Sequence, residues 1–303
     1  MKTETRMIHD VIIVGGSYAG LAAALQLARA RRKVLVIDGG SPRNRFAKSS
    51  HGFLGQDGRA PGDILADARA QLMAYPTVNW LDANADKASA IGHDFHVTAA
   101  GKDHEAQRLI LATGVCDELP AIPGLAERWG VAVFHCPYCH GYELDQGSIG
   151  VLATSEGSMH HALMLPDWGE TIFFLNGAFT PDEEQAAELK RRGAKVETTR
   201  IRRISGERAD VELEDGRVIS LCGLFTLTRT SMASPLAEQL GCAFEEGPLG
   251  PYIQTNEFKE TSVQGVYACG DAARPAGAVA LAVGDGTLAG TGVHQSIIFH
   301  RDP

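Results

Sequence analysis

The sequence contains no long hydrophobic run. None of its apolar stretches approaches the roughly 18–20 residues that a helix needs to span a bilayer. Its first ten residues carry Glu4 and Asp10 and lack the apolar core of a secretory signal. We therefore expect a cytoplasmic protein without a membrane partner, in a compartment where structural disulfides are rare.

An excess of positive charge is also missing. The 303-residue chain has 28 Lys and Arg residues against 37 Asp and Glu residues, a formal net charge of −9. This balance argues against nucleic acid as the main partner. Internal repeats, low-complexity tracts and long linkers are absent as well, and the length suffices for two domains of ordinary size.

What the sequence does contain is a βαβ opening. Residues 10–14 form an apolar run without alternation, as in a strand that is covered on both faces. A tight turn over 15–20 leads into an Ala/Leu-rich helix over 21–31, and 33–38 is the next strand. This order predicts a parallel sheet.

A second strand-turn-helix unit follows later in the chain. Residues 149–153 and 172–175 are apolar strands, with a helix starting at 158–165 between them. The segment 180–183 predicts a capping box at Thr180 with Pro at the first helical position, and Gly193 ends that helix.

Two further buried strands complete the plan, at 109–114 and within 265–271, and a Gly/Ala-rich helix follows the second. Pro120 and Pro123 mark a crossover. We predict an α/β protein with two nucleotide-binding, Rossmann-like domains, the second inserted into the first. The first comprises residues 1–117 and 244–303 and the second residues 118–243.

One close cysteine pair stands out, because Cys136 and Cys139 are separated by two residues and followed by His140. In a reducing compartment such a pair is catalytic or metal-binding more often than structural. A structural zinc site usually needs two pairs, so we expect no metal. The other cysteines are single and are predicted to be buried small hydrophobic residues: Cys116, Cys222, Cys242 and Cys269.

The turn over 15–20 is placed correctly for a dinucleotide fingerprint, since it follows a strand and opens a helix. Ser17 occupies the middle glycine position. Asp38 ends the next strand, where an acid meets a ribose hydroxyl. Backbone N–H groups at the helix start would hold a pyrophosphate.

The order of these motifs resembles the low-molecular-weight thioredoxin reductase family. The resemblance is carried by the opening fingerprint, by Ala112-Thr113-Gly114, by the inserted Cys-x-x-Cys, and by Gly-Val-Tyr-Ala-Cys-Gly-Asp over 265–271. It implies a homodimeric FAD protein with an inserted NADPH domain. It also implies that Cys139 faces the flavin C4a and that Cys136 exchanges with substrate.

The resemblance further implies a set of FAD contacts. They are Gly15, Ser17, Tyr18, Ala19, Gly20, Asp38, Gly39, Ala112, Thr113, Gly114, Gly270, Asp271, Ala278 and Val279. Asn44 and His51 follow the ribose acid, and they either touch the isoalloxazine ring or belong to a solvated basic loop.

The inserted domain departs from the family pattern. The glycine positions of its fingerprint fall on Ala153, Ser155 and Ser158, and Glu156 puts a negative charge where a pyrophosphate would lie. No arginine for a 2′-phosphate follows the strand 172–175. The sequence therefore argues against NADPH, with a divergent site built on backbone contacts as the alternative. His160 and His161, in this turn, are predicted to be a surface pair.

His140 is the second departure, because thioredoxin reductases have an acid there. A histidine followed by Gly141-Tyr142-Glu143 resembles flavin-dependent dithiol oxidases of natural-product pathways. Only a thiolate attacks a disulfide, and an imidazole near neutrality can take the thiol proton. Placing Cys136 at a helix N-terminus would favour its thiolate further.

We therefore predict an FAD-dependent dithiol oxidase that uses Cys136, Cys139 and His140 and passes electrons to O2. One alternative is a reductase of a thioredoxin-like protein, driven by NADPH or ferredoxin. Another, from a different class, is a flavin redox sensor or binding module without turnover. The partner is then a small-molecule dithiol or a thioredoxin-like protein, and the sequence does not name it.

Overall fold

The computed structural model describes residues 8–299. Residues 1–7 and 300–303, both assigned to the first predicted domain, lie outside the described residues. The chain divides into two compact units. Unit 1 includes residues 8–43, 62–116 and 230–299, and unit 2 includes 44–61 and 117–229. The predicted α/β class is confirmed, since each unit contains parallel strands.

Unit 1 is built on a seven-stranded sheet in the order β3-β2-β1-β6-β5-β4, with β19 beside β6. β1 pairs in parallel with β2 and β6, whereas β5 runs antiparallel to β4 and β6. The strands are β1 Ile8–Val14, β2 Val34–Asp38, β3 Val78–Asp82, β4 Ala85–Ile91, β5 Asp94–Ala99, β6 Lys102–Leu111 and β19 Val266–Ala268. A hairpin of β17 Phe244–Gly247 and β18 Gly250–Ile253 belongs to the same unit.

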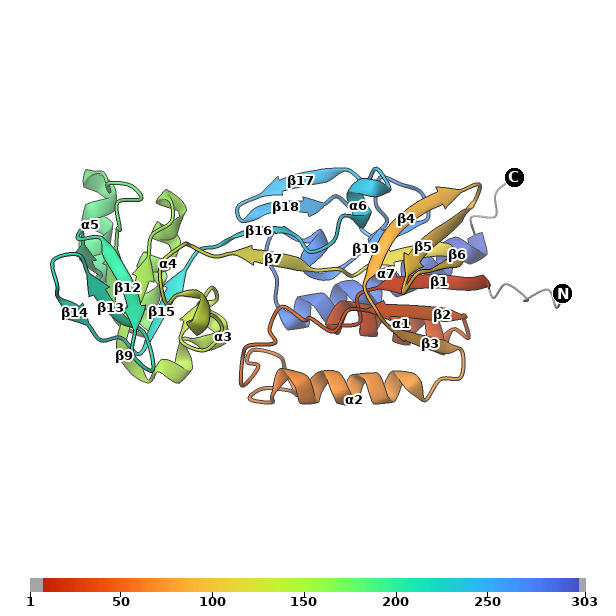
Figure 1. The fold of residues 1–303 in the computed structure, drawn as a ribbon, viewed down its shortest axis with the longest axis horizontal. Coiled ribbons are helices and arrows are strands. Elements are labelled where there is room, and N and C mark those ends of the chain that lie inside the picture. Colours follow the sequence, from red (N-terminus) through yellow and green to blue (C-terminus); the bar gives the residue numbers. More distant parts are fainter. Residues whose placement is uncertain (1–7, 300–303) are drawn as a thin grey trace. The chain divides into compact units, whose positions relative to one another are not determined.

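Helices cover the sheet of unit 1, and α1 lies along α7 (Figure 1). They are α1 Tyr18–Arg29, α2 Pro61–Met73, α6 Leu236–Gln239 and α7 Val279–Phe299, and the short helical turn η5 spans Gly270–Ala273. Val11 and Ile13 of β1 are fully buried in the hydrophobic core that α1 and α7 share. Among the helices of residues 8–299, none combines the length and apolar character that a membrane span requires.

The predicted βαβ opening is confirmed with small shifts. Val11, Ile12 and Ile13 have no exposed surface, as expected for a strand that is covered on both faces. α1 begins at Tyr18 rather than at residue 21, with Ser17 as its N-cap residue. β6 begins at Lys102 rather than at residue 109, because its polar first half pairs with β5 in a half-exposed antiparallel ladder.

Unit 2 is built on a parallel sheet in the order β11-β10-β9-β15-β8 and a small antiparallel sheet β12-β13-β14. Its strands are β8 Val133–Phe134, β9 Gln146–Leu152, β10 Gly169–Phe174, β11 Lys195–Glu197, β12 Ile201–Ser205, β13 Asp210–Leu213, β14 Val218–Ile219 and β15 Gly223–Thr226. Its helices are α3 Pro137–His140, α4 Met159–Met164 and α5 Glu183–Arg192. Its helical turns are η1 Ala126–Arg128, η2 Tyr142–Leu144, η3 Glu156–Ser158 and η4 Leu165–Asp167.

Two short strands, β7 Val115–Glu118 and β16 Arg229–Met232, pair where the chain leaves and re-enters unit 1. They correct one prediction, because Cys116 is exposed. In a two-stranded ladder every second side chain faces outward, and Cys116 occupies such a position beside buried Val115. Cys222 is only partly buried, whereas Cys242 and Cys269 are buried as predicted.

The capping box of α5 also differs from the prediction. The N-cap is Asp182, not Thr180, and the Asp182 carboxylate accepts a hydrogen bond from the Gln185 N–H at 2.8 Å. The Gln185 side chain accepts one in return from the Asp182 N–H at 3.0 Å. Both residues fit the capping pattern, since Thr180 would have Glu183 at the third helical position and Asp182 has Gln185 there, and Asp is the somewhat better N-cap residue. Gly193 ends the helix in the left-handed conformation, as predicted.

Candidate functional site

The turn between β1 and α1 accepts only glycine at its two ends. Gly15 has a φ of +102°, and a Cβ there would lie 2.2 Å from the Ala112 carbonyl oxygen. A Cβ on Gly20 would lie 1.8 Å from the Gly15 carbonyl oxygen. The middle position tolerates Ser17, which caps α1 without a side-chain hydrogen bond. The first N–H groups of α1 lack partners within the helix, and they can therefore bind a phosphate.

Three predicted cofactor segments come together at the carboxyl ends of neighbouring strands. Val14 of β1 and Ala268 of β19 both align with Leu111 of β6. The segments 15–20, 112–114 and 270–271 therefore leave the sheet side by side. A Cβ on Gly270 would lie 2.9 Å from the Ala19 Cβ, so the last segment packs against the start of α1. Ligands of open α/β sheets bind at this edge.

The two predicted acids of this edge have defined partners. Asp38, at the end of β2, accepts a hydrogen bond from the Gly16 N–H at 3.0 Å. Asp271 accepts one from Arg43 Nη1 at 2.9 Å. Gly39 lies against Asn84, and Ala278 and Val279 are at the start of α7. The residues present fit the diphosphate and ribose of a dinucleotide cofactor such as FAD.

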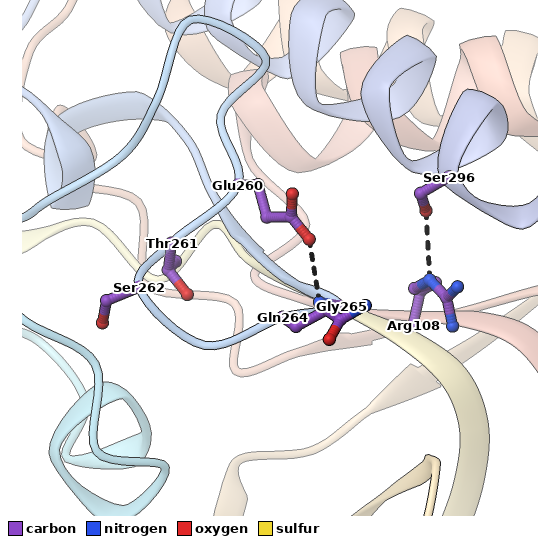
Figure 2. Close-up of a pocket in the computed structure, with 7 residues that line it drawn as sticks. All are labelled: Arg108, Glu260, Thr261, Ser262, Gln264, Gly265 and Ser296. Carbon is purple, nitrogen blue, oxygen red and sulfur yellow. Dashed lines mark hydrogen bonds between the residues drawn. The ribbon is translucent and has the colours of Figure 1, made fainter. Parts of the chain in front are cut away.

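A cavity of about 300 Å³ in unit 1 lies elsewhere (Figure 2). It is lined by Arg108, Glu260, Thr261, Ser262, Gln264, Gly265 and Ser296. These residues flank the amino end of β19, whereas the cofactor segments follow its carboxyl end. Arg108 donates to Ser296 at 3.0 Å, and Glu260 accepts from the Gly265 N–H at 3.0 Å. Each of the two charged groups of this cavity therefore has a hydrogen-bond partner within unit 1.

The turn after β9 is closed by its own side chains. The Thr154 N–H donates to Ser158 Oγ at 3.0 Å, and the Thr154 hydroxyl donates to the Leu227 carbonyl oxygen at 2.8 Å. Glu156 accepts a hydrogen bond from Gln185 at 2.6 Å. One N–H that would face a pyrophosphate is thus satisfied internally, and a carboxylate is fixed beside the turn. These residues do not fit a pyrophosphate.

Arg200 is a residue that the sequence analysis missed. Its guanidinium lies against Gly177, just after β10, where a Cβ would approach Arg200 Nη2 to 2.8 Å. Asn176, in the left-handed conformation, accepts a hydrogen bond from the Ile201 N–H at 2.8 Å and so holds the two segments together. Sequence reasoning looked for arginines directly after this strand, whereas this one comes from a distant segment.

Cys136 and Cys139 form a disulfide across the first turn of α3. Cys136 is the N-cap residue, at the helix N-terminus that the sequence analysis considered, and Pro137 is the first residue of this helix. The Cys139 N–H donates to the Cys136 carbonyl oxygen at 3.2 Å. Gly141 ends the helix, and a Cβ there would meet the Trp168 ring at 2.7 Å. In this position Cys136 is the sulfur at the helix N-terminus, where a thiolate is stabilised.

His140 is held in an apolar setting beside the disulfide. Its ring stacks on Phe134, with centroids 4.3 Å apart and planes 21° apart. Burial, followed by the charge of His51, lowers the pKa of His140 from 6.5 to about 4. His140 is therefore neutral at pH 7. It can accept a proton, but its protonated form is less stable than that of a free imidazole.

His51 and Asn44 lie in the segment 44–61, which belongs to the same compact unit as the disulfide. His51 Nε2 is 3.0 Å from Ser49 Oγ and 3.4 Å from Glu143 Oε1. The segment also packs on the main chain of unit 2, since a Cβ on Gly130 would meet the Phe46 Cβ at 2.6 Å. The predicted contact of Asn44 and His51 with a flavin ring stays a prediction.

The prediction of a surface pair at 160–161 is wrong for one member. His160 is exposed, whereas His161 is buried with 4% of its surface exposed. α4 turns His161 inward, toward Phe225 at a centroid distance of 6.4 Å. Burial and the neighbouring His160 charge lower the pKa of His161 to about 4. In a short helix adjacent residues face different sides, which the sequence alone did not resolve.

The sequence and the fold are similar to those of known disulfide oxidoreductases. The family model described as pyridine nucleotide-disulphide oxidoreductase matches residues 9–155 and 178–286. A curated relative from Claviceps purpurea, "Thioredoxin reductase tcpT", is 34% identical over 88% of each chain. An oxidoreductase structure from Agrobacterium tumefaciens is 59% identical, with a TM-score of 0.95, over 97% of this chain and 100% of that one. The structure of HlmI is 34% identical, with a TM-score of 0.90, over 98% of this chain and 94% of that one.

Proposed function

Since the chain belongs to the pyridine nucleotide-disulphide oxidoreductase family, among its low-molecular-weight thioredoxin reductase-like members, we propose that this flavin-dependent enzyme oxidises small-molecule dithiols to disulfides. The observation that carries the proposal is an intact redox disulfide in a nucleotide-type domain whose phosphate turn is closed by its own side chains. We further propose O2 as the electron acceptor, a cytoplasmic location and a homodimer.

FAD is the cofactor that the family implies. The turn 15–20 would hold its pyrophosphate, Asp38 its ribose, and Asp271 the segment between ribityl and phosphate. When bound, FAD takes up the two electrons that the dithiol releases and passes them to the acceptor. The remaining predicted contacts, at 112–114 and at the start of α7, would complete the walls of this site.

The thiol chemistry belongs to three residues of unit 2. A substrate thiolate attacks Cys136, which forms a mixed disulfide and leaves Cys139 as a thiolate. The second substrate thiol then attacks the substrate sulfur bonded to Cys136, so the product disulfide closes and Cys136 is released. The protein thereby receives two electrons from the substrate. These two electrons and two protons then reduce O2 to H2O2.

His140 serves as the first acceptor of the thiol proton in this proposal. A free thiol titrates near pH 8.5 and His140 near 4, a gap of roughly 4.5 units that corresponds to about 6 kcal/mol. A proton left on His140 alone would therefore return to the thiol. His140 must accept it while a negative charge develops nearby, or pass it to another group.

Anaerobic mixing tests the proposal. The purified holoenzyme is mixed with dithiothreitol or with NADPH, and flavin absorbance is followed near 450 nm. We expect rapid bleaching by the dithiol, little by NADPH, and no bleaching of Cys136→Ser by the dithiol. Rapid bleaching by NADPH, with none by dithiols, would refute the dithiol oxidase.

The position of Arg200 supports a second candidate, an NADPH-driven reductase of a thioredoxin-like protein. A guanidinium beside Gly177, just after the second strand of a nucleotide fold, is where a 2′-phosphate would bind. This candidate predicts NADPH oxidation coupled to disulfide reduction, with a KM for NADPH that rises at least tenfold in Arg200→Ala and much less in Arg202→Ala. Equal effects of the two substitutions would contradict it.

A further inference from the structure

His51 is surrounded by polar groups that the chemistry above leaves unused. Its Nε2 lies 3.0 Å from Ser49 Oγ and 3.4 Å from Glu143 Oε1, and its Nδ1 lies 3.6 Å from Asp57 Oδ1. The His51 side chain is 18% exposed, whereas those of Glu143 and Asp57 are 41% and 67% exposed. The imidazole thus lies between the interior of unit 2 and two carboxylates that reach solvent.

The same imidazole is close to the redox motif. Glu143 lies in η2, which follows directly after α3 and its terminal residue His140. The charges of His51 and His140 interact, since His51 contributes to the lowered pKa of His140. The segment 44–61 belongs to the same compact unit as the disulfide, although it is far from it in sequence.

His140 and His51 differ in the groups that surround the ring when it is protonated. An imidazolium at His140 would stack on the apolar Phe134 ring and has no carboxylate within ion-pair distance among residues 8–299. An imidazolium at His51 has two carboxylate partners and a hydroxyl. The two carboxylate oxygens lie 3.6 and 3.4 Å from the His51 ring nitrogens.

We propose that His51, with Glu143, is the proton acceptor of the dithiol site. The proposal rests on the proposed function. A substrate thiol loses its proton through His140 to His51, while Cys139 leaves the protein disulfide as a thiolate. After the substrate disulfide has closed, the second substrate proton is on Cys136, the first stays on His51, and Cys139 carries the negative charge. Charge and proton number therefore balance, and both protons later leave with H2O2.

The charged and titratable groups that face His51 in unit 2 are Glu143 from η2, His140 from α3 and Asp57 from its own segment. The test therefore uses His51→Gln, which keeps a side chain able to hydrogen-bond but cannot hold a proton. His160→Gln is the matched control, because His160 is an exposed histidine of the same unit. Glu143→Gln removes one carboxylate partner with little change of shape.

The holoenzyme is mixed anaerobically with dithiothreitol between pH 5.5 and 9, in weak buffer with an indicator dye. In the wild type and in His160→Gln we expect the protein to take up both substrate protons near pH 7. His51→Gln should release about one proton per dithiol oxidised, and its rate of flavin bleaching should fall at least tenfold near pH 7 and recover at high pH. Glu143→Gln should show a smaller loss in the same direction.

A purely structural role for His51 would lower the rate equally at all pH values and leave proton uptake unchanged, and that result would overturn the inference. The same holds if His51→Gln matches the wild type in both measurements. If the wild type is not reduced by any dithiol, the proposed function fails instead, which this experiment distinguishes because proton uptake is scored only on enzyme that has been reduced.

Discussion

The buried imidazole of His161 should make unit 2 sensitive to acid. In the folded protein the pKa of His161 is lowered from 6.5 to about 4. As the pH falls below 6.5, the unfolded chain binds a proton that the folded chain refuses. The contribution of neutral His161 is therefore complete above pH 6.5 and is lost as the pH falls toward 4. The shift corresponds to about 3 kcal/mol in full, and to about 2.5 kcal/mol at pH 4.5.

Replacing His161 with Gln removes this titration and keeps a side chain that can hydrogen-bond. The matched control is His160→Gln, since His160 is adjacent and exposed. The chain has three tryptophans, of which Trp129 and Trp168 lie in unit 2 and Trp80 in unit 1. In a Trp80→Phe background, tryptophan fluorescence during urea unfolding reports on unit 2 alone.

The quantity to compare is the loss in the free energy of unfolding between pH 7 and pH 4.5. We expect this loss to be about 2.5 kcal/mol smaller in His161→Gln than in the parent. In His160→Gln it should shrink far less, because that substitution removes only the lesser of the two causes that lower the pKa of His161. Part of the loss remains in His161→Gln, because the pKa of His140 is lowered in the folded protein as well. An equal loss in the parent and His161→Gln would refute the assignment of the acid sensitivity to this imidazole.

Two further substitutions test the cofactor turn and the corrected helix cap. Gly20→Ala places a Cβ 1.8 Å from the Gly15 carbonyl oxygen and should abolish retention of flavin, measured as the ratio of absorbance at about 450 and 280 nm. Gly62→Ala, where a Cβ meets nothing within 4 Å, should retain it. Asp182→Ala should lower the free energy of unfolding of unit 2 by about 1 kcal/mol, whereas Thr180→Ala should leave it nearly unchanged.

The meeting of the three predicted cofactor segments in unit 1 was predictable because its determinants are local. A buried strand, a glycine turn and a helix follow one another within residues 8–29, and the geometry of the turn depends on contacts between Gly15 and Gly20. Ala112 and Gly270 follow strands that could be recognised by the same apolar pattern. Parallel pairing then brings the three segments to one edge, so the sheet rule supplies what the sequence does not state.

The features that escaped prediction depend on contacts between distant segments. His51 approaches Glu143, and Arg200 approaches Gly177, through packing that no local pattern encodes. The environment of His140 was also out of reach, since the stacking on Phe134 depends on where β8 ends. Sequence reasoning therefore identified the dithiol and its histidine but not the groups that set the proton affinity of that histidine.

The structure also explains how a nucleotide-type domain can keep its dithiol while its phosphate turn changes. The turn follows β9, whereas Cys136 follows β8, and the two strands lie on opposite sides of β15. Phe134 at the end of β8 packs on Phe225 of β15 and on His140, so the redox motif is held by the core of the sheet. Residues 154–158 of the turn lie outside this hydrophobic core, whereas Ala153 belongs to it. The redox motif and the turn after β9 are therefore positioned by different strands of the same sheet.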